Sequence, residues 1–153
     1  MTKKWKNIKN VLIIGAGAQG NVISGVLSKA DDVSKIVLSD INLERVKEIA
    51  EMNKSDKIKV RRIDATNVNE MENFMKDEKF DLVVNATLPE FNRQIIQASY
   101  RAKINYIDMA SAEIYPQKDI PIEQLEYNKE WKDAGLKALI GGGGDPGLSN
   151  IMA

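Results

Sequence analysis

The stretch that decides the fold is residues 10–27, NVLIIGAGAQGNVISGVL. The apolar residues 11–14 run into a loop whose three glycines, Gly15, Gly17 and Gly20, are spaced G-x-G-x-x-G. A buried strand, such a loop and the start of a helix are together typical of a binding site for the pyrophosphate of a dinucleotide. The glycine spacing alone is a weak signal, so the rest of the chain has to support or reject this interpretation.

Each position of the loop has a physical role in that interpretation. Gly15 makes the tight turn out of the strand, Gly17 lets the backbone approach the pyrophosphate, and Gly20 lets the helix lie close to the sheet. The helix that opens with Ala18 and Gln19 offers unpaired N–H groups and a partial positive charge to phosphate. These five residues are therefore predicted to bind the cofactor. An ordinary strand–helix turn with incidental glycines is the alternative.

Apolar residues elsewhere alternate between strand-like and helix-like spacing. Strands are predicted at 11–14, 35–39, 58–63, 80–85, 104–108 and 136–140, and helices at 18–30, 42–53, 67–77, 90–102 and 122–134. This alternation predicts an α/β protein, a Rossmann-type doubly wound parallel sheet of about six strands with helices on both faces. Its binding crevice would lie beyond the carboxyl ends of the strands, where the strand order reverses.

Two of the predicted helices already suggest which side chains they bury. Along 18–30, Val22, Val26 and Leu27 recur at helical spacing. The helix at 122–134 is more polar, and Leu125 and Trp131 are its expected anchors. The segment 115–124 between strands contains two of the four prolines and is expected to be a surface loop.

The composition excludes several kinds of chemistry. No cysteine and no histidine are present, so acid–base work falls to Asp, Glu, Lys or Tyr, and no metal site is expected. Lys+Arg and Asp+Glu both number 22, so neither nucleic acid nor an anionic membrane surface is the expected partner. Without a long apolar run or a signal-peptide cleavage pattern, a cytoplasmic protein is expected.

Asp40 ends the second predicted strand, about 20 residues beyond the glycine loop. In this fold that position faces the adenosine ribose, where a carboxylate accepts hydrogen bonds from both hydroxyls and repels a 2′-phosphate. Asp40 therefore predicts NAD rather than NADP. It could instead cap the helix at 42–53, although Asn42 can serve there. Arg61 and Arg62 could hold a 2′-phosphate but lie within a strand.

Two further strand ends complete the predicted binding edge. Asp64 and Ala65 close the third strand, at the part of the edge that would contact the adenine ring. Asp64 could accept a hydrogen bond from the exocyclic amine of adenine, or it could simply start a turn. Asn85, Ala86 and Thr87 end the fourth strand on the far side of the switch point. Small residues there would let the cofactor pass, so these positions are also predicted to contact it.

The sequence ends with GGGGDPGLSNIMA at 141–153. This stretch predicts a turn, Asp145 as an N-cap and Pro146 at the first position of a helix, and the sequence ends about two turns later without a helix-stop signal. We therefore expect residues 1–153 to be one dinucleotide-binding domain of a longer protein, with a second domain for substrate binding and dimerisation absent from this chain. A short terminal helix that frays is the alternative.

Two segments, taken with the glycine loop, resemble the saccharopine dehydrogenase family: NYIDMAS at 105–111 and AGLKALIGGGGDPGLSNIMA at 134–153. That family includes saccharopine reductases, lysine 6-dehydrogenase and carboxynorspermidine-forming enzymes. The resemblance implies hydride transfer between NAD and a carbon bonded to an amine nitrogen, on an amino-acid or polyamine-type substrate. It also implies a second domain that supplies most substrate contacts, and a possible homodimer.

The resemblance also implies roles for particular residues. Ala110 and Ser111 would lie beside the nicotinamide, and Gly144, Asp145 and Pro146 would line the cleft between the domains. Asp108 and Asp145 are the acids at strand ends nearest the nicotinamide, so they are weak candidates for the proton acceptor. A turn carboxylate and a helix cap are their respective alternatives, and the catalytic base is expected in the second domain.

Two other functions stay open. A regulatory nucleotide sensor, like the gating domains of potassium transporters, shares the glycine loop and the acid after the second strand. Such a sensor has no reason to carry GGGGDPGLSN, and nucleotide-dependent dimerisation would favour it. Another two-domain NAD-dependent dehydrogenase is the second alternative. The preferred interpretation predicts that the isolated chain binds NAD and turns nothing over.

Overall fold

The structure, a computed structural model, describes residues 8–110, 123–144 and 147–153. The strands are β1 (Asn10–Ile14), β2 (Lys35–Asp40), β3 (Ile58–Arg62), β4 (Leu82–Asn85), β5 (Asn105–Asp108) and β6 (Ala138–Leu139). The helices are α1 (Ala18–Ser28), α2 (Leu43–Asn53), α3 (Val68–Glu78), α4 (Asn92–Arg101), α5 (Asn128–Asp133) and α6 (Leu148–Met152). Short 3₁₀ turns occupy Pro89–Phe91 and Glu123–Tyr127.

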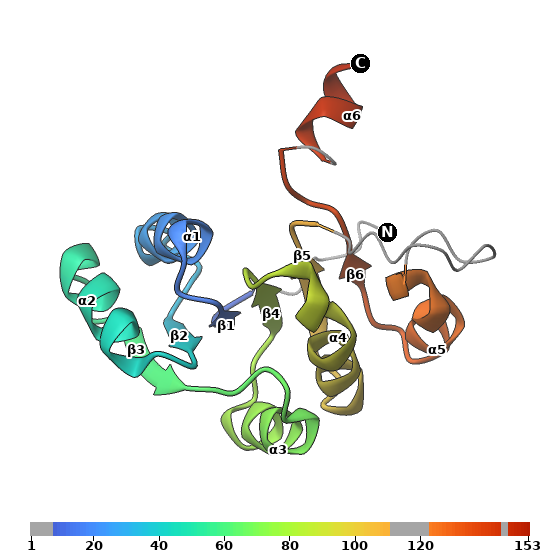
Figure 1. The fold of residues 1–153 in the computed structure, drawn as a ribbon, viewed down its shortest axis with the longest axis horizontal. Coiled ribbons are helices and arrows are strands. Elements are labelled where there is room, and N and C mark those ends of the chain that lie inside the picture. The colour runs from blue at the N-terminus through green and yellow to red at the C-terminus, as the bar shows by residue number, and fades with distance from the viewer. Residues whose placement is uncertain (1–7, 111–122, 145–146) are drawn as a thin grey trace.

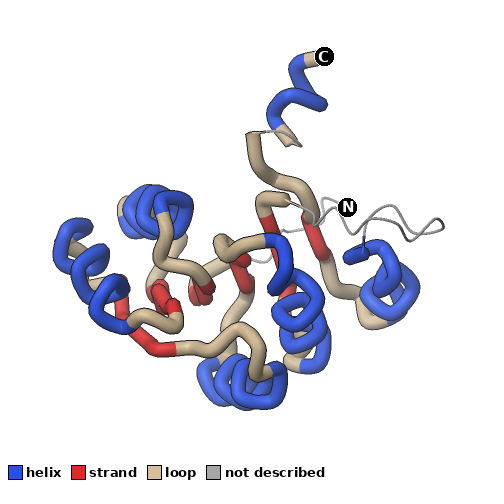
Figure 2. The backbone as a smooth tube through the Cα atoms, in the orientation of Figure 1, coloured by secondary structure: helices blue, strands red, loops and turns tan. Residues whose placement is uncertain are grey.

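The strands form one six-stranded parallel sheet in the order β3-β2-β1-β4-β5-β6 (Figures 1 and 2). The predicted Rossmann-type fold is confirmed, and each predicted strand is present, although β6 is shorter than 136–140. The order reverses between β1 and β4, so the loop that follows β1 lies at the switch point. Ligands of such sheets bind outside the carboxyl ends of the strands at this place.

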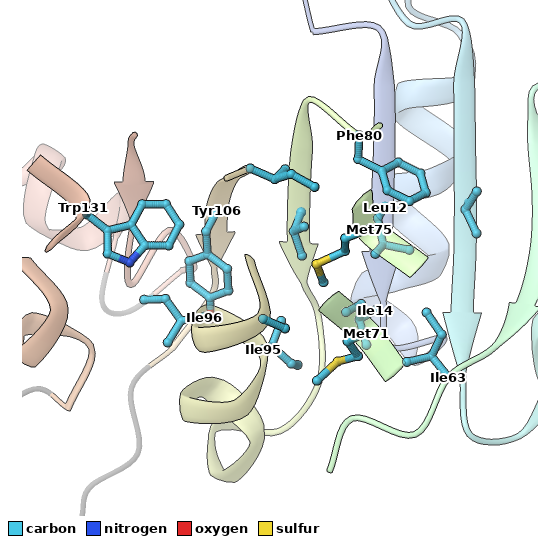
Figure 3. Close-up of a cluster of buried hydrophobic side chains, with 14 residues drawn as sticks. Leu12, Ile14, Ile63, Met71, Met75, Phe80, Ile95, Ile96, Tyr106 and Trp131 are labelled. Carbon is cyan, nitrogen blue, oxygen red and sulfur yellow. The ribbon is translucent and has the colours of Figure 1, made fainter. Parts of the chain in front are cut away.

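Two apolar cores hold the helices to opposite faces of the sheet. On one face α1 and α2 pack on the sheet around Val11, Ile13, Ile36, Leu38, Val46 and Ile49. On the other face α3 and α4 pack around Leu12, Ile14, Met71, Met75, Ile95 and Ile96 (Figure 3). Because successive strand residues face opposite sides, β1 contributes alternately to both cores. A strand buried on both faces reads as a continuous apolar run, which is why 11–14 is so strong a signal.

The buried face of α1 differs from the prediction. Val22 and Val26 are 62% and 64% exposed, and only Leu27 of the predicted trio packs on the core. The buried residues of α1 are Gly20 and Ser24, and Ile23 packs against the core beside Leu27. A Cβ at Gly20 would overlap the carbonyl of Gly15, so the first turn of α1 lies too close to the glycine loop for any side chain at this position.

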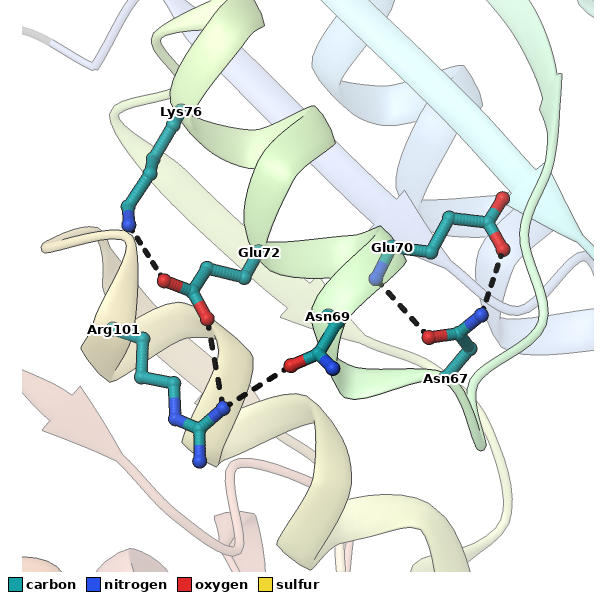
Figure 4. A network of polar contacts seen from close by, with 6 residues as sticks. All are labelled: Asn67, Asn69, Glu70, Glu72, Lys76 and Arg101. Carbon is teal, nitrogen blue, oxygen red and sulfur yellow. Dashed lines mark hydrogen bonds and ion pairs between the residues drawn. The ribbon is translucent and has the colours of Figure 1, made fainter.

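Hydrogen bonds and ion pairs join α3 to α4 (Figure 4). Asn67 caps α3 by accepting a hydrogen bond from the Glu70 N–H at 3.1 Å. Glu72 accepts from Lys76 at 2.6 Å and lies 3.6 Å from Arg101 of α4, and these cations hold the pKa of its carboxyl below the usual range. Pairs of this kind contribute little individually, so the apolar core remains the main support of this face.

The C-terminal part of the chain corrects two predictions. Trp131 is buried, but Leu125 is 47% exposed, so only one of the two expected anchors faces the core. Helix α6 begins at Leu148 with Gly147 as its N-cap, rather than at Pro146 after an Asp145 cap. Gly147 has a φ of 131°, which glycine tolerates, and its N–H donates to the Asn150 side chain at 2.9 Å. The predicted loop 115–124 lies almost entirely outside the described residues.

A helix that crosses a bilayer needs about 20 predominantly apolar residues. None of the helices in residues 8–110, 123–144 and 147–153 is long and apolar enough to cross a membrane.

Candidate functional site

A cavity of about 600 Å³ lies at the carboxyl ends of β1, β2, β3 and β4. It brings together most of the predicted cofactor residues, namely Gly15, Gly17, Ala18, Gln19, Asp40, Asp64, Ala65, Ala86 and Thr87. Gly20 and Asn85 are not on its wall; both are buried directly behind it. The switch point therefore carries an open site of a size that suits part of a dinucleotide.

The glycine loop is shaped by close backbone contacts. Gly15 has a φ of 108° and donates its N–H to the Ser39 carbonyl at 2.8 Å. A Cβ at Gly15 would lie 2.5 Å from the Ala86 carbonyl oxygen, so β1 and β4 approach too closely for a side chain there. Gly17 is different, because a Cβ on it would meet no protein atom within 4 Å. The absence of a side chain at Gly17 therefore leaves space in the cavity rather than solving a packing problem.

The Asp40 carboxylate is held at the mouth of this cavity by two backbone amides. Its Oδ2 accepts from the Ala16 N–H at 2.8 Å and its Oδ1 accepts from the Asn42 N–H at 3.0 Å. Asn42 is the N-cap of α2 and accepts from the Arg45 N–H at 3.2 Å, so the capping role belongs to Asn42. Each carboxylate oxygen can accept a further hydrogen bond, which leaves Asp40 able to receive ribose hydroxyls.

Arg45 is a site residue that the sequence reasoning missed. It stands in the first turn of α2 and lines the same cavity as Asp40. Among the described residues, no carboxylate is paired with its guanidinium. Arg61, considered for a 2′-phosphate, lies with its guanidinium carbon 4.5 Å from the Phe74 ring centroid and is not on the cavity wall. The position of Arg45 just after the acid at the end of β2 was the available signal.

Asp64 forms the turn that was its alternative role. Its Oδ1 accepts from the Thr66 N–H at 2.9 Å and from the Thr66 hydroxyl at 2.7 Å, and these bonds hold the pKa of Asp64 below its usual range. Asp64 also lines the cavity. A contact from its other oxygen to an adenine amine stays a prediction.

Apolar side chains form the walls of the cavity between these polar groups. Ile41, directly after β2, and Leu88, three residues after the end of β4, line the cavity and are 54% and 65% exposed. Ile63 and Phe91 line it further inside. Apolar walls with a few polar groups are usual for sites that take a planar ring such as adenine. The sequence reasoning did not select these residues, because an apolar residue after a strand reads equally well as core.

Asn85 lies behind the cavity and shapes one of its loops. Its Oδ1 accepts from the Thr87 N–H at 3.0 Å and from the Thr87 hydroxyl at 2.7 Å. Its Nδ2 donates to Asn92 Oδ1 at 2.8 Å and to the Tyr106 hydroxyl at 3.0 Å. Asn85 is therefore placed to hold the loop that lines the cavity, and a direct cofactor contact stays a prediction.

Asp108 is 1% exposed and lines neither this cavity nor the neighbouring groove. Its carboxylate accepts from the Gly141 N–H at 2.7 Å, from Gln124 Nε2 at 3.0 Å and from the Tyr106 hydroxyl. Burial raises the pKa of this carboxyl above its usual range, although these hydrogen bonds oppose the shift. A role for Asp108 as proton acceptor stays a prediction.

A separate groove of about 660 Å³ lies on the side of α1 that faces β4 and β5. Gln19 lines both spaces, and Ala110 lines the groove together with the glycine segment 142–144. The Ala110 carbonyl accepts from Asn92 Nδ2 at 2.8 Å. Ser111 and Asp145, the two remaining predicted site residues, lie outside the described residues.

The sequence of this chain also matches the model of a known family. Residues 11–139 match the domain described as the saccharopine dehydrogenase NADP binding domain. This chain belongs to the saccharopine dehydrogenase family. The resemblance predicted from NYIDMAS and GGGGDPGLSN is thus confirmed. The family's domain is described as NADP-binding, whereas Asp40 predicts NAD.

Two curated relatives and one solved structure are also similar to this chain. The chain is 31% identical over 148 residues to carboxyaminopropylagmatine dehydrogenase of Synechocystis sp., and 28% identical over 159 residues to carboxynorspermidine synthase of Vibrio cholerae. These matches cover 93% and 94% of this chain but only 36% and 38% of the relatives. Among solved structures, apo saccharopine dehydrogenase (L-Glu forming) from Saccharomyces cerevisiae superposes with a TM-score of 0.76 at 22% identity, covering 94% of this chain and 29% of that one.

Proposed function

We propose that this chain is the NAD-binding domain of an oxidoreductase that acts on the CH–NH group of an amino-acid-derived amine of the polyamine type. The observation that carries the proposal is the cavity at the switch point, with Gly17 open to it and the Asp40 carboxylate held at its mouth. The chain spans less than two fifths of the curated relatives it matches, so by itself it is expected to bind cofactor without turnover.

The pyrophosphate would be bound at the start of α1. This helix has no side-chain cap and no acidic residue in its first turn, so its first N–H groups and the positive end of its dipole are available to an anion. The Ala16 N–H is already taken by Asp40, which leaves those of Gly17, Ala18 and Gln19 as the donors on the cavity wall. When bound, the nicotinamide would accept or supply hydride at the carbon next to the amine nitrogen, while this chain binds and orients it.

The ribose end decides between NAD and NADP by a balance of charges. A 2′-phosphate would add up to two negative charges near the Asp40 carboxylate, which two backbone amides hold in place. Arg45 is an exposed positive charge on the same wall and would favour that phosphate. Ordering a long exposed side chain costs conformational entropy that the fixed carboxylate does not incur. We therefore expect NAD to bind in preference to NADP.

Calorimetric titration of the chain with NAD and NADP tests this preference. The wild-type chain should bind NAD at least about 10-fold more tightly than NADP. Asp40→Asn keeps the size of the side chain and removes the charge, so it should shift the ratio of the two Kd values toward NADP by roughly 10-fold or more. Arg45→Gln in the Asp40→Asn variant should lower the affinity for NADP while changing the affinity for NAD little.

Two results would contradict the proposal in different ways. Heat from neither nucleotide would remove the dinucleotide function altogether. Tighter binding of NADP by the wild-type chain would show that the attraction of the 2′-phosphate to Arg45 exceeds its repulsion by Asp40. The chain would then prefer NADP, as the name of the family's domain says. A cytoplasmic location and a homodimer stay predictions.

A further inference from the structure

The glycine-rich segment after β6 is held to the sheet mainly by one residue. Strand β6 has only two residues, paired as Tyr106 with Ala138 and Ile107 with Leu139. Beyond that pairing, the Asp108 carbonyl accepts from the Gly142 N–H at 2.8 Å and the Asp108 Oδ1 accepts from the Gly141 N–H at 2.7 Å. A Cβ at Gly142 would lie 3.2 Å from the Asp108 carbonyl oxygen, so the segment lies directly against this residue.

The same carboxylate is joined by hydrogen bonds to the loop on the cavity wall. The Tyr106 hydroxyl donates to Asp108 and accepts from Asn85 Nδ2 at 3.0 Å. Asn85 in turn accepts from the N–H and the hydroxyl of Thr87, which lines the cavity. An unbroken series of hydrogen bonds therefore runs from the glycine segment, through Asp108 and Tyr106, to the loop after β4.

This series is buried, which makes its geometry specific. Asn85, Tyr106, Asp108 and Gln124 are each at most 3% exposed. Gln124 donates to Asp108 Oδ2 at 3.0 Å, while its own buried Oε1 has no hydrogen-bond partner among the described residues. With the Gln124 amide turned the other way, its oxygen would face the Asp108 carboxylate and repel it. The hydrogen bond to Asp108 therefore fixes the orientation of the amide, although Oε1 is left unpaired. A buried, charged carboxylate destabilises the folded state unless hydrogen bonds of good geometry compensate for its desolvation.

The glycine segment lies where the second half of a dinucleotide would reach. Residues 142–144 line the groove with Ala110, and Gln19 lines both this groove and the dinucleotide cavity. Asp40 and Asp64 mark the opposite, β2–β3 end of the cavity. A dinucleotide whose adenosine lies at that end would extend its nicotinamide toward Gln19 and the glycine segment.

We propose that Asp108 is a positioning residue for the nicotinamide half of the cofactor; this inference rests on the proposed function. It fixes the segment 141–144 relative to the loop 85–88, so that both surround the nicotinamide in one arrangement. Asp108 does not touch the cofactor; it acts through the Gly141 N–H on one side and through Tyr106 and Asn85 on the other.

Titration of the chain with NADH and with ADP-ribose separates this role from a general effect on folding. Asp108→Ala should leave the Kd for ADP-ribose within about threefold, because the adenosine and pyrophosphate contacts lie elsewhere. The change in nicotinamide fluorescence when NADH binds should fall by at least half. The double variant Asp108→Asn, Gln124→Glu exchanges the donor and the acceptor and should restore most of this signal.

Amide hydrogen exchange at Gly141 and Gly142 provides the matched structural measurement. Exchange should accelerate in Asp108→Ala, which removes the acceptor of the Gly141 N–H. Where that variant does not fold, Tyr106→Phe takes its place, since it keeps the ring and removes only the hydroxyl between Asn85 and Asp108; the nicotinamide signal should again fall.

The outcomes distinguish the two proposals. Faster exchange with an unchanged nicotinamide signal would overturn the positioning role, because the hydrogen bonds would then support the fold alone. Equal losses of NADH and ADP-ribose affinity would overturn it as well. Binding of neither compound by the wild-type chain would refute the proposed function, and the positioning role would fall with it.

Discussion

Replacement of Gly17 by alanine is expected to leave the chain folded and to weaken NAD binding by roughly 100-fold, about 2.7 kcal/mol. Gly17 has φ and ψ of −82° and −163°, which alanine adopts without strain, and its Cβ would meet no protein atom within 4 Å. Gly17 lines the cavity at the start of α1, so the added methyl group would occupy the space proposed for the pyrophosphate. The damage should therefore appear in binding and not in stability.

Calorimetry with NAD and urea unfolding of the same preparation test the Gly17→Ala prediction. The free energy of unfolding should stay within about 1 kcal/mol, because the smaller entropy of the unfolded chain and the loss of a good N-cap residue act in opposite directions. An unchanged Kd for NAD would show that the pyrophosphate does not pass over Gly17. A large loss of stability would show that the open space at Gly17 matters to the fold itself.

Replacement of Gly20 by alanine should have the opposite result, a loss of about 3 kcal/mol or more in the free energy of unfolding. A Cβ at Gly20 would overlap the Gly15 carbonyl oxygen and lie 3.0 Å from the Gly15 carbonyl carbon. Both are backbone atoms of the tight turn, which the N–H of Gly15 holds to β2. Relief requires α1 to move away from the sheet, which would loosen the core beneath it.

Gly25→Ala is the matched control for Gly20→Ala, since both glycines belong to α1. A Cβ at Gly25 would lie 2.5 Å from Asn53 Oδ1, the end of a flexible side chain that can rotate away. Helix propensity favours alanine by about 1 kcal/mol and offsets part of the hydrogen bonds that Asn53 would lose. Urea unfolding should rank Gly20→Ala as far more destabilising; equal effects would contradict the close contact of α1 with the loop.

The sequence was sufficient where local chemistry and periodicity determine structure. Residues 11–14 form a strand buried on both faces, and Asn42 caps α2 as its side chain predicts. The regular alternation of strands and helices leaves few parallel topologies, and the glycine loop places the switch point at the end of β1. The family likewise follows from motifs that are contiguous in the sequence.

Only the tertiary structure decided which residues meet across the fold. Val22 and Val26 are exposed because α1 turns Gly20, Ile23, Ser24 and Leu27 inward instead, with Gly20 against the Gly15 carbonyl, and periodicity did not select that face. Asp108 looks like a free acid at a strand end in the sequence. In the fold it is buried and bonded to Gln124 and Gly141, which approach it from later elements of the chain. Hydrogen bonds between distant segments depend on distance in space, and the order of the residues does not contain that information.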